Sequence, residues 1–148
     1  MSSVSEIMSK KEIVTITAFS GKNLQDVASL MVSGRVGSVI VIDKNTQPLG
    51  IITERDIVKH IYLKNIAASR IEVEEIMSAP LITIMSYDSI DTASRVMTKN
   101  KIKRLAVLEE DNRIVGLLSV TDIIRHLAKI LLDDYNRYRS LRFAIDLS

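Results

Sequence analysis

The sequence predicts a mixed α/β (α+β) fold in which two tandem β-α-β-β-α units pack with pseudo-twofold symmetry into one module. Three observations support this fold class: an internal repeat, hydrophobic patterns that change in the same order in both copies, and polar turns at matching places. A unit of about 60 residues is too small to bury both faces of its sheet alone. Packing of the two copies against each other solves this problem.

The internal repeat aligns residues 24–61 with residues 90–127 without a gap. Its offset of 66 residues pairs Gly50 with Gly116. Further upstream the offset is 69 residues, so the first copy has three extra residues, which we place around residues 19–23. The predicted boundaries are 4–66 for the first unit, 70–132 for the second unit and 133–148 for a C-terminal helical extension or tail.

The first half of each copy predicts a strand followed by a helix. β-branched residues dominate 13–17 and 81–84, as they do in strands. Apolar residues then recur with helical spacing in 24–33 and 89–99. After these helices come the two residue types best suited to the left-handed position beyond a helix end, Gly34 and Asn100.

The second half of each copy predicts two strands joined by a turn, and then a second helix. The matching segments are the strands 38–42 and 104–108, the polar turns 43–46 and 110–113, and the strands 49–52 and 114–118. Thr53 and Ser119 are the expected N-caps of the second helices, which we expect to run to about Asn65 and to Leu132 or beyond.

Composition excludes several classes of protein. With 148 residues, 47 % of them hydrophobic and 26 % charged, the chain is globular. A net charge of only +2 does not indicate binding to nucleic acid or to an anionic membrane. There is no cysteine, which excludes disulfides and thiolate metal sites. The start has no secretory signal pattern, and the apolar runs are far shorter than a bilayer span. We therefore expect a soluble, cytoplasmic protein without a membrane partner.

Two matching heptapeptides carry the chemistry. Residues 50–56 read GIITERD and residues 116–122 read GLLSVTD. A strand that ends just before a hydroxyl N-cap exposes backbone N–H groups at a helix start, which suits a phosphate. Asp56 and Asp122, three residues after the cap, can accept two hydrogen bonds from a ribose. The same spacing also fits a capping box without any ligand, and the residues alone leave both interpretations open.

Both heptapeptides resemble the G-h-h-[S/T]-x-x-D signature of the cystathionine β-synthase (CBS) domain, where h is apolar. Glu6-Ile7-Met8, Glu75-Ile76-Met77 and residues 100–107 extend the resemblance, which covers roughly residues 4–132. Tandem pairs of this domain form the Bateman module. The resemblance implies adenine-nucleotide binding, with AMP, ADP or ATP as ligand and the two aspartates on the ribose. It also implies homodimers formed through helices.

The resemblance further assigns residues to two clefts. In the first, Thr53 and Asp56 would hold the ribose while basic residues of the other copy, Lys101, Lys103 and Arg104, reach the phosphates. The second cleft, with Ser119, Asp122 and Arg35, has fewer cations and is expected to bind weakly or not at all. Adenine is expected against the first strands, near Thr15, Ile16, Ile82 and Thr83.

The tail, residues 133–148, mixes apolar side chains with arginines. One interpretation is a helix extension that packs on its own module, and the other is a docking or dimerisation segment. Met31, Met97 and the segment 127–132 are candidate sources of apolar surface for a dimer.

We therefore expect a non-catalytic ligand-sensing protein, with no catalytic cofactor and no metal. No phosphate loop or nucleophile–base arrangement is found, and nucleic acid is not the expected partner because no aromatic pair accompanies the basic cluster. Two alternatives remain open. The ligand is S-adenosylmethionine or NAD(H), or the clefts are empty and the chain serves as a dimerisation or docking module. Any regulated protein lies outside the reach of the sequence.

Overall fold

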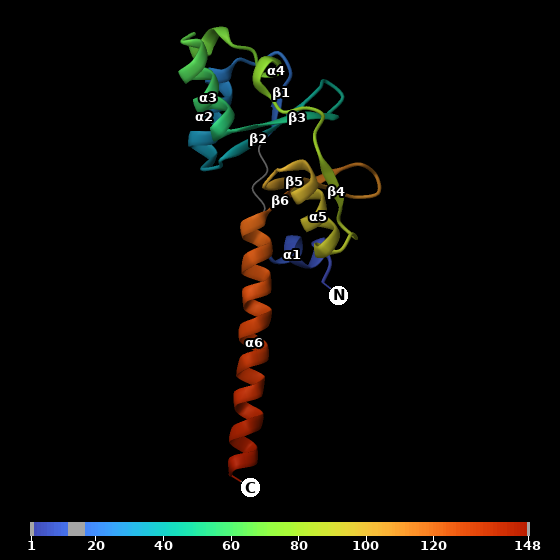
Figure 1. Cartoon of the computed structure of the whole chain (residues 1–148). Helices are drawn as coiled ribbons and strands as arrows, with labels where there is room; N and C mark the ends of the chain where they lie inside the picture. The colour runs from blue at the N-terminus through green and yellow to red at the C-terminus, as the bar shows by residue number, and fades with distance from the viewer. Residues whose placement is uncertain (1, 12–16, 148) are drawn as a thin grey trace.

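The computed structural model of the protein describes residues 2–11 and 17–147. It contains two three-stranded sheets with helices around them, and a long C-terminal helix that projects away from both (Figure 1). The mixed α/β class predicted from the repeat is confirmed. Within the described ranges, no helix is both long enough and apolar enough to cross a membrane.

The two sheets repeat one topology. In each, the first strand is parallel and the third antiparallel to a central second strand. The first sheet consists of β1 (Thr17–Phe19), β2 (Ser38–Ile42) and β3 (Pro48–Thr53), and the second of β4 (Thr83–Met85), β5 (Arg104–Leu108) and β6 (Ile114–Ser119). Most of the strand predicted at 13–17 lies outside the described residues. The strand predicted at 81–84 begins at Thr83 instead.

The helices occupy the predicted places in the repeat. The first helix of each unit, α2 (Leu24–Gly34) and α5 (Ile90–Asn100), joins the first two strands. The second helix of each unit follows the third strand, as α3 (Glu54–Lys64) and α6 (Val120–Asp146). Thr53 and Ser119 cap these helices as predicted, since each hydroxyl accepts a hydrogen bond from the third helical N–H group.

The predicted left-handed positions are wrong by one residue. Gly34 and Asn100 are the last helical residues, and the left-handed residues are Arg35 (φ 52°) and Lys101 (φ 54°). The cause is the apolar residue that follows each cap. Val36 donates its N–H to the Met31 carbonyl at 3.1 Å and packs on the core of the first unit, as in a Schellman motif.

The segments leading into each repeat pack on the opposite unit. Side chains from α1 (Val4–Lys10) complete the core of the second sheet, together with β4, α5, β5, β6 and Ile123. Side chains from α4 (Val73–Ile76), which follows a short 3-10 helix (Ala68–Arg70), complete the core of the first sheet. Each packed unit therefore combines residues from both sequence copies.

A third apolar cluster joins the two units. Its buried residues are Ile40 and Ile42 of β2 and Ala106 of β5, with Leu81, Ile114 and Leu117 packed against them. Because these side chains come from both sheets, the third cluster is an apolar contact shared by the two units, which adds to the burial that each small unit achieves alone.

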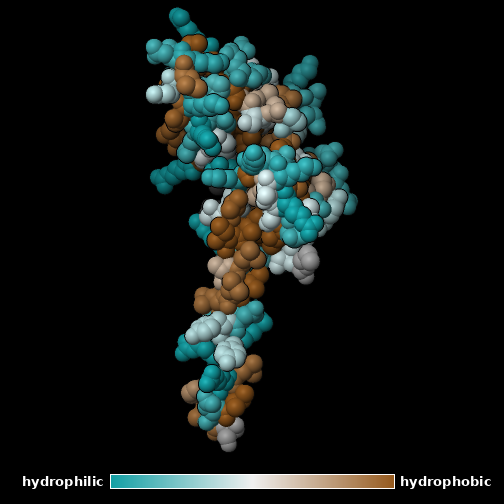
Figure 2. Space-filling view, viewed as in Figure 1, coloured by the Kyte–Doolittle hydropathy of each residue, from teal (hydrophilic) through white to brown (hydrophobic). Residues whose placement is uncertain are grey.

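The tail does not pack on its own module. α6 has 27 residues and extends to Asp146, and every described side chain from Leu127 to Leu147 is exposed. Apolar residues lie along this projecting helix in two groups separated by polar ones (Figure 2). The prediction that Met31 and Met97 supply apolar surface for a dimer is also wrong, because both side chains are buried in the cores of the two units.

Candidate functional site

A cavity of about 460 Å³ lies where the start of α3 meets the loop before β5. Thr53 and Asp56 from the first unit line it, and so do Lys103 and Arg104 from the second. The structure thus brings together the four residues that the sequence analysis assigned to the first cleft. Apolar walls come from Ile51, Leu81, Ile82 and Ile102.

The Asp56 carboxylate closes a capping box. Its Oδ2 accepts from the Thr53 N–H at 2.9 Å and from the Thr53 hydroxyl at 3.0 Å, while the Asp56 N–H donates to Thr53 Oγ1 at 3.3 Å. The cap interpretation is therefore correct. The capping box uses only one oxygen of the carboxylate, because within the described residues Oδ1 accepts no hydrogen bond.

The start of α3 is a weaker phosphate site than the sequence suggested. Glu54 donates its N–H to the Gly37 carbonyl at 3.1 Å, and Asp56 donates its N–H to Thr53. Two of the first three helical N–H groups are thus already paired, contrary to the expectation of free donors. Recognition of an anion falls mainly to side chains.

The cavity is lined by four cationic side chains and two carboxylates. Three of the cations, Lys101, Lys103 and Arg104, were predicted from the sequence. The fourth cation, Arg55, and the acidic Glu54 were not predicted. Both occupy the two variable positions of the heptapeptide, so the motif itself gave no signal for them. Gly37 lies close to two oppositely charged side chains. A Cβ at this position would stand 3.5 Å from the Glu54 carboxylate and 3.6 Å from the Arg104 guanidinium.

The linker between the units forms one side of the cavity. Ser78 and Ile51 exchange two backbone hydrogen bonds, at 3.0 and 2.9 Å, as an antiparallel bridge beside β3. A Cβ on Gly50 would lie 2.6 Å from the Ser78 carbonyl oxygen. The motif glycine is therefore required for this close approach, which holds Pro80, Leu81 and Ile82 at the cavity.

The remaining predicted residues are placed differently. Ile82 lines the cavity, whereas Thr83 begins β4 without lining it. Arg35 lines a separate hollow between α2 and α3 and is not brought to Ser119 and Asp122. Thr15 and Ile16 lie outside the described residues.

In the second cleft, Asp122 is the counterpart of Asp56, and its carboxylate forms an ion pair with Lys11. Lys11 Nζ donates to Asp122 Oδ2 and to the Leu117 carbonyl, at 2.8 and 2.7 Å. Asp122 Oδ2 also accepts from the Ser119 N–H at 2.9 Å. Lys11 was not predicted as a site residue from the sequence, although the upstream offset of 69 residues pairs it with Pro80 of the first cleft.

This contact changes the electrostatics of the second cleft. Burial alone raises the pKa of Asp122, but the hydrogen bonds from Lys11 and Ser119 outweigh it and hold the pKa below its ordinary value. The Asp122 side chain is only 10 % exposed. A ribose at this carboxylate would have to compete with a partly buried, charge-assisted hydrogen bond.

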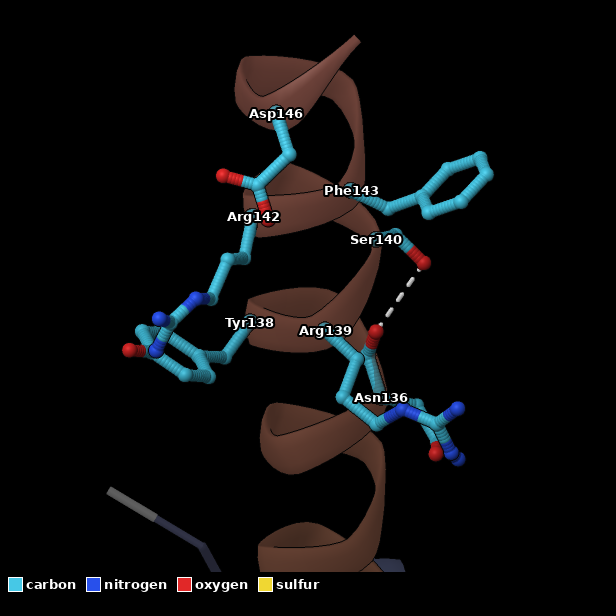
Figure 3. Close-up of a pocket in the computed structure, with 7 residues that line it drawn as sticks. All are labelled: Asn136, Tyr138, Arg139, Ser140, Arg142, Phe143 and Asp146. Atoms are coloured by element: carbon cyan, nitrogen blue, oxygen red, sulfur yellow. Dashed lines mark hydrogen bonds between the residues drawn. The ribbon is translucent and has the colours of Figure 1, made fainter.

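Two other features carry no ligand chemistry. A hollow of about 560 Å³ near the end of α6 is lined only by residues of that helix, whose side chains fan out from it (Figure 3). Among residues 2–11 and 17–147, no three His, Cys, Asp or Glu side chains are grouped so that they could hold a metal ion.

The family model of the CBS domain matches residues 4–63 and 73–129, one match for each copy of the repeat. The chain belongs to the CBS domain family. Its signature heptapeptides are the segments that form the two capping boxes, and the cavity lies between its two CBS motifs.

Curated relatives agree with this assignment. The CBS domain-containing protein YhcV of Bacillus subtilis is 30 % identical over 83 % of this chain and 84 % of its own length. An uncharacterized protein of Methanocaldococcus jannaschii is 32 % identical over 74 % of this chain, and one of Methanopyrus kandleri is 27 % identical over the same share. The chain spans only 59 % and 56 % of those two archaeal proteins.

Solved CBS structures share the fold. A putative signal-transduction protein with CBS domains from Burkholderia ambifaria has 26 % identity and a TM-score of 0.77, covering 85 % of this chain and 93 % of its own. The CBS domain pair of protein MJ0100, in complex with 5′-methylthioadenosine and S-adenosyl-L-methionine, has 26 % identity and a TM-score of 0.74. That match covers 87 % of this chain and 98 % of the other.

Proposed function

We propose that this CBS pair is a non-catalytic sensor that binds an adenine nucleotide, AMP, ADP or ATP, in the cavity between its motifs. One observation carries the proposal: Thr53 and Asp56 of the first motif share a cavity with Lys101, Lys103 and Arg104 of the second. Oδ1 of Asp56, which accepts no hydrogen bond from the part of the chain that the structure describes, would accept from the ribose, and the cations would hold the phosphates. Ile82 and its apolar neighbours would contact the adenine.

Adenosyl chemistry is supported by the MJ0100 pair, which holds two adenosyl compounds at 26 % identity. The choice of a phosphate-bearing ligand rests on this chain's own residues, because four cations outnumber two carboxylates in the cavity lining. S-adenosylmethionine remains the second candidate, since it shares the adenosine and carries a carboxylate that a lysine or arginine would bind. NAD(H) would add a second nucleotide to the same cations.

The two clefts are proposed to differ in occupancy. Lys11 already forms an ion pair with the Asp122 carboxylate, whereas no lysine or arginine among residues 2–11 and 17–147 pairs with the matching carboxylate of Asp56. We therefore propose one strong site per chain, with Ser119, Asp122 and Arg35 contributing at most a weak second site. Because the shared core at β2 and β5 lies beside the cavity, occupancy would alter how the two motifs sit together, and a regulated protein would detect that change.

Calorimetric titration of the nucleotide-stripped protein tests the proposal. AMP, ADP, ATP, S-adenosylmethionine and NADH are titrated in turn, with one nucleotide bound per chain as the expected result. At 100 times its dissociation constant the nucleotide should stabilise the fold by about 2.7 kcal/mol, visible as a higher Tm.

Variants separate the candidates. Asp56→Ala should abolish binding, whereas Asp122→Ala, the same change in the second cleft, should retain it. If Lys103→Ala with Arg104→Ala leaves affinity unchanged while Asp56→Ala removes it, S-adenosylmethionine is the better ligand. If none of the five compounds binds, the empty docking module replaces the sensor.

A further inference from the structure

The projecting part of α6 carries a seam of apolar residues with coiled-coil spacing. Leu127, Leu131, Asp134, Tyr138 and Leu141 follow one another at alternating intervals of four and three residues. This alternation places them on one face of a helix. The four apolar side chains are between 46 and 69 % exposed. Helices gain most of their stability from burying such a face, so the seam calls for a partner.

We propose that the α6 seam is the docking site for α6 of a second copy of this chain, in antiparallel orientation and centred near Asn136. In this register Leu131 meets Leu141 of the second copy, and Leu127 meets the second copy's Ile145. The polar layer pairs Asp134 with Tyr138 of the second copy, whose hydroxyl donates to the carboxylate. Each layer then occurs twice, as twofold symmetry requires.

Charge favours the antiparallel orientation. A parallel pair in register would place Asp134 against Asp134 of the second copy inside the apolar seam, where like charges are destabilising. The antiparallel pair instead puts Asp133 and Asp134 level with Arg139 and Tyr138 of the second copy. It also brings Asp146 level with the basic start of the other α6, which carries Arg125 and Lys129. At these levels each acidic side chain lies beside a basic or hydroxyl-bearing residue of the second copy.

The surface of the helix has the same symmetry. Figure 2 shows one apolar group near the body and another near the C-terminal end, with a polar stretch between them. In an antiparallel pair, the apolar group near the body of one copy packs on the apolar group near the C-terminal end of the other, and the two polar stretches face each other. In Figure 3, Tyr138 lies on the opposite side of the helix from Ser140 and Phe143, and the off-seam Arg142 lies on the same side as Tyr138.

Cysteine cross-linking tests the orientation directly, because the natural chain has no cysteine. Full-length Leu131→Cys and Leu141→Cys proteins are oxidised separately and as a mixture. The mixture should give a disulfide dimer joining position 131 to position 141, and each variant alone should give little. In the antiparallel register, two residues at position 131 lie about 15 Å apart along the axis, too far for a disulfide. A 131-to-131 cross-link, or none in any combination, overturns the proposal.

Sedimentation equilibrium of the uncross-linked proteins provides the second measurement. Leu131→Asp should raise the dimer dissociation constant by about tenfold or more, because it buries an unpaired charge in the seam. Leu132→Asp is the matched control: it changes the neighbouring leucine, which is also largely exposed (58 % against 69 %) but lies off the seam, and should leave dimerisation intact. Circular dichroism confirms that both variants fold. Equal dimerisation by both variants overturns the proposal, as does a monomeric wild-type chain that binds anionic lipid vesicles through this helix.

Discussion

Gly50 shows how one residue of the heptapeptide shapes the cavity. Replacing it with alanine would put a Cβ 2.6 Å from the Ser78 carbonyl oxygen, so the linker has to move. We expect Gly50→Ala to lower the free energy of unfolding by about 1–3 kcal/mol, the usual range for overpacking, and to weaken nucleotide binding. Urea unfolding and calorimetry measure the two effects.

Gly37 provides the control for this substitution. A Cβ on Gly37 makes only ordinary contacts, the nearest at 3.5 Å, and its φ is not left-handed. Gly37→Ala should therefore leave stability unchanged or raise it by up to about 1 kcal/mol. If both alanine variants lose the same stability, close approach of the linker is not the reason for the motif glycine.

The ion pair between Lys11 and Asp122 predicts a specific pH dependence. Because the folded-state pKa of Asp122 is lowered, its stabilising contribution is complete above the ordinary value of 3.8 and is lost as pH falls through the lower folded value. We expect Lys11→Met to destabilise the protein at pH 7 by about 1 kcal/mol, since the lysine is partly exposed.

Urea unfolding at several pH values tests this expectation. The stability difference between wild type and Lys11→Met should shrink as the pH is lowered below 3.8, because Asp122 becomes protonated in both proteins. The part due to the hydrogen bond from Lys11 to the Leu117 carbonyl should remain. Lys10→Met, the neighbouring exposed lysine, serves as control. A difference that stays constant over this pH range would rule out the ion pair as its source.

At the scale of elements, the helix ends carry the next prediction. Arg35 holds a left-handed conformation with φ 52°, which disfavours residues that have a Cβ. We expect Arg35→Gly to raise the free energy of unfolding by about 1 kcal/mol. Its exposed side chain makes no salt bridge within the described residues, so little is lost. Thermal unfolding measures the change, and a lower Tm for the variant would contradict it.

These ends also show what residue preferences can and cannot predict. Gly34 and Asn100 correctly signalled that both helices stop there, but not in which register. The apolar residue after each cap, Val36 or Ile102, decides the register because it has to reach its core. The capping boxes at Thr53 and Ser119 were predictable because every group in them lies within four residues.

Features that join distant segments were harder to predict. The cavity residues were found only because the two motif copies could be compared, and because the resemblance placed the basic residues of one opposite the ribose site of the other. Lys11 lies 111 residues from Asp122, and no local pattern marks it. The sequence left two interpretations of the tail open, and the structure contradicts packing on its own module, because every described side chain from Leu127 to Leu147 is exposed.

At the scale of the whole molecule, the packed units are not the sequence repeats. Val4, Ile7 and Met8 of α1 belong to the core of the second sheet, while Val73 and Ile76 of α4 belong to that of the first. The periodicity of the repeat is the same whether a leading segment packs on its own unit or the other, so the sequence left this undecided. The two units are therefore joined by the packing of α1 on the second sheet, by the packing of α4 on the first sheet, and by the apolar cluster between β2 and β5.

Two fragments of nearly equal length test this exchange. Residues 1–66 form the first sequence copy but lack α4, whereas residues 11–79 omit α1 and keep α4 with the first sheet. Burying an apolar side chain contributes about 1.5–3 kcal/mol, so loss of Val73 and Ile76 should leave residues 1–66 without a cooperative transition. Residues 11–79 should melt cooperatively, though at a lower temperature than the intact chain, when followed by circular dichroism. If 1–66 melts cooperatively and 11–79 does not, each leading segment stabilises its own copy, and the exchange contributes nothing to the stability of the first sheet.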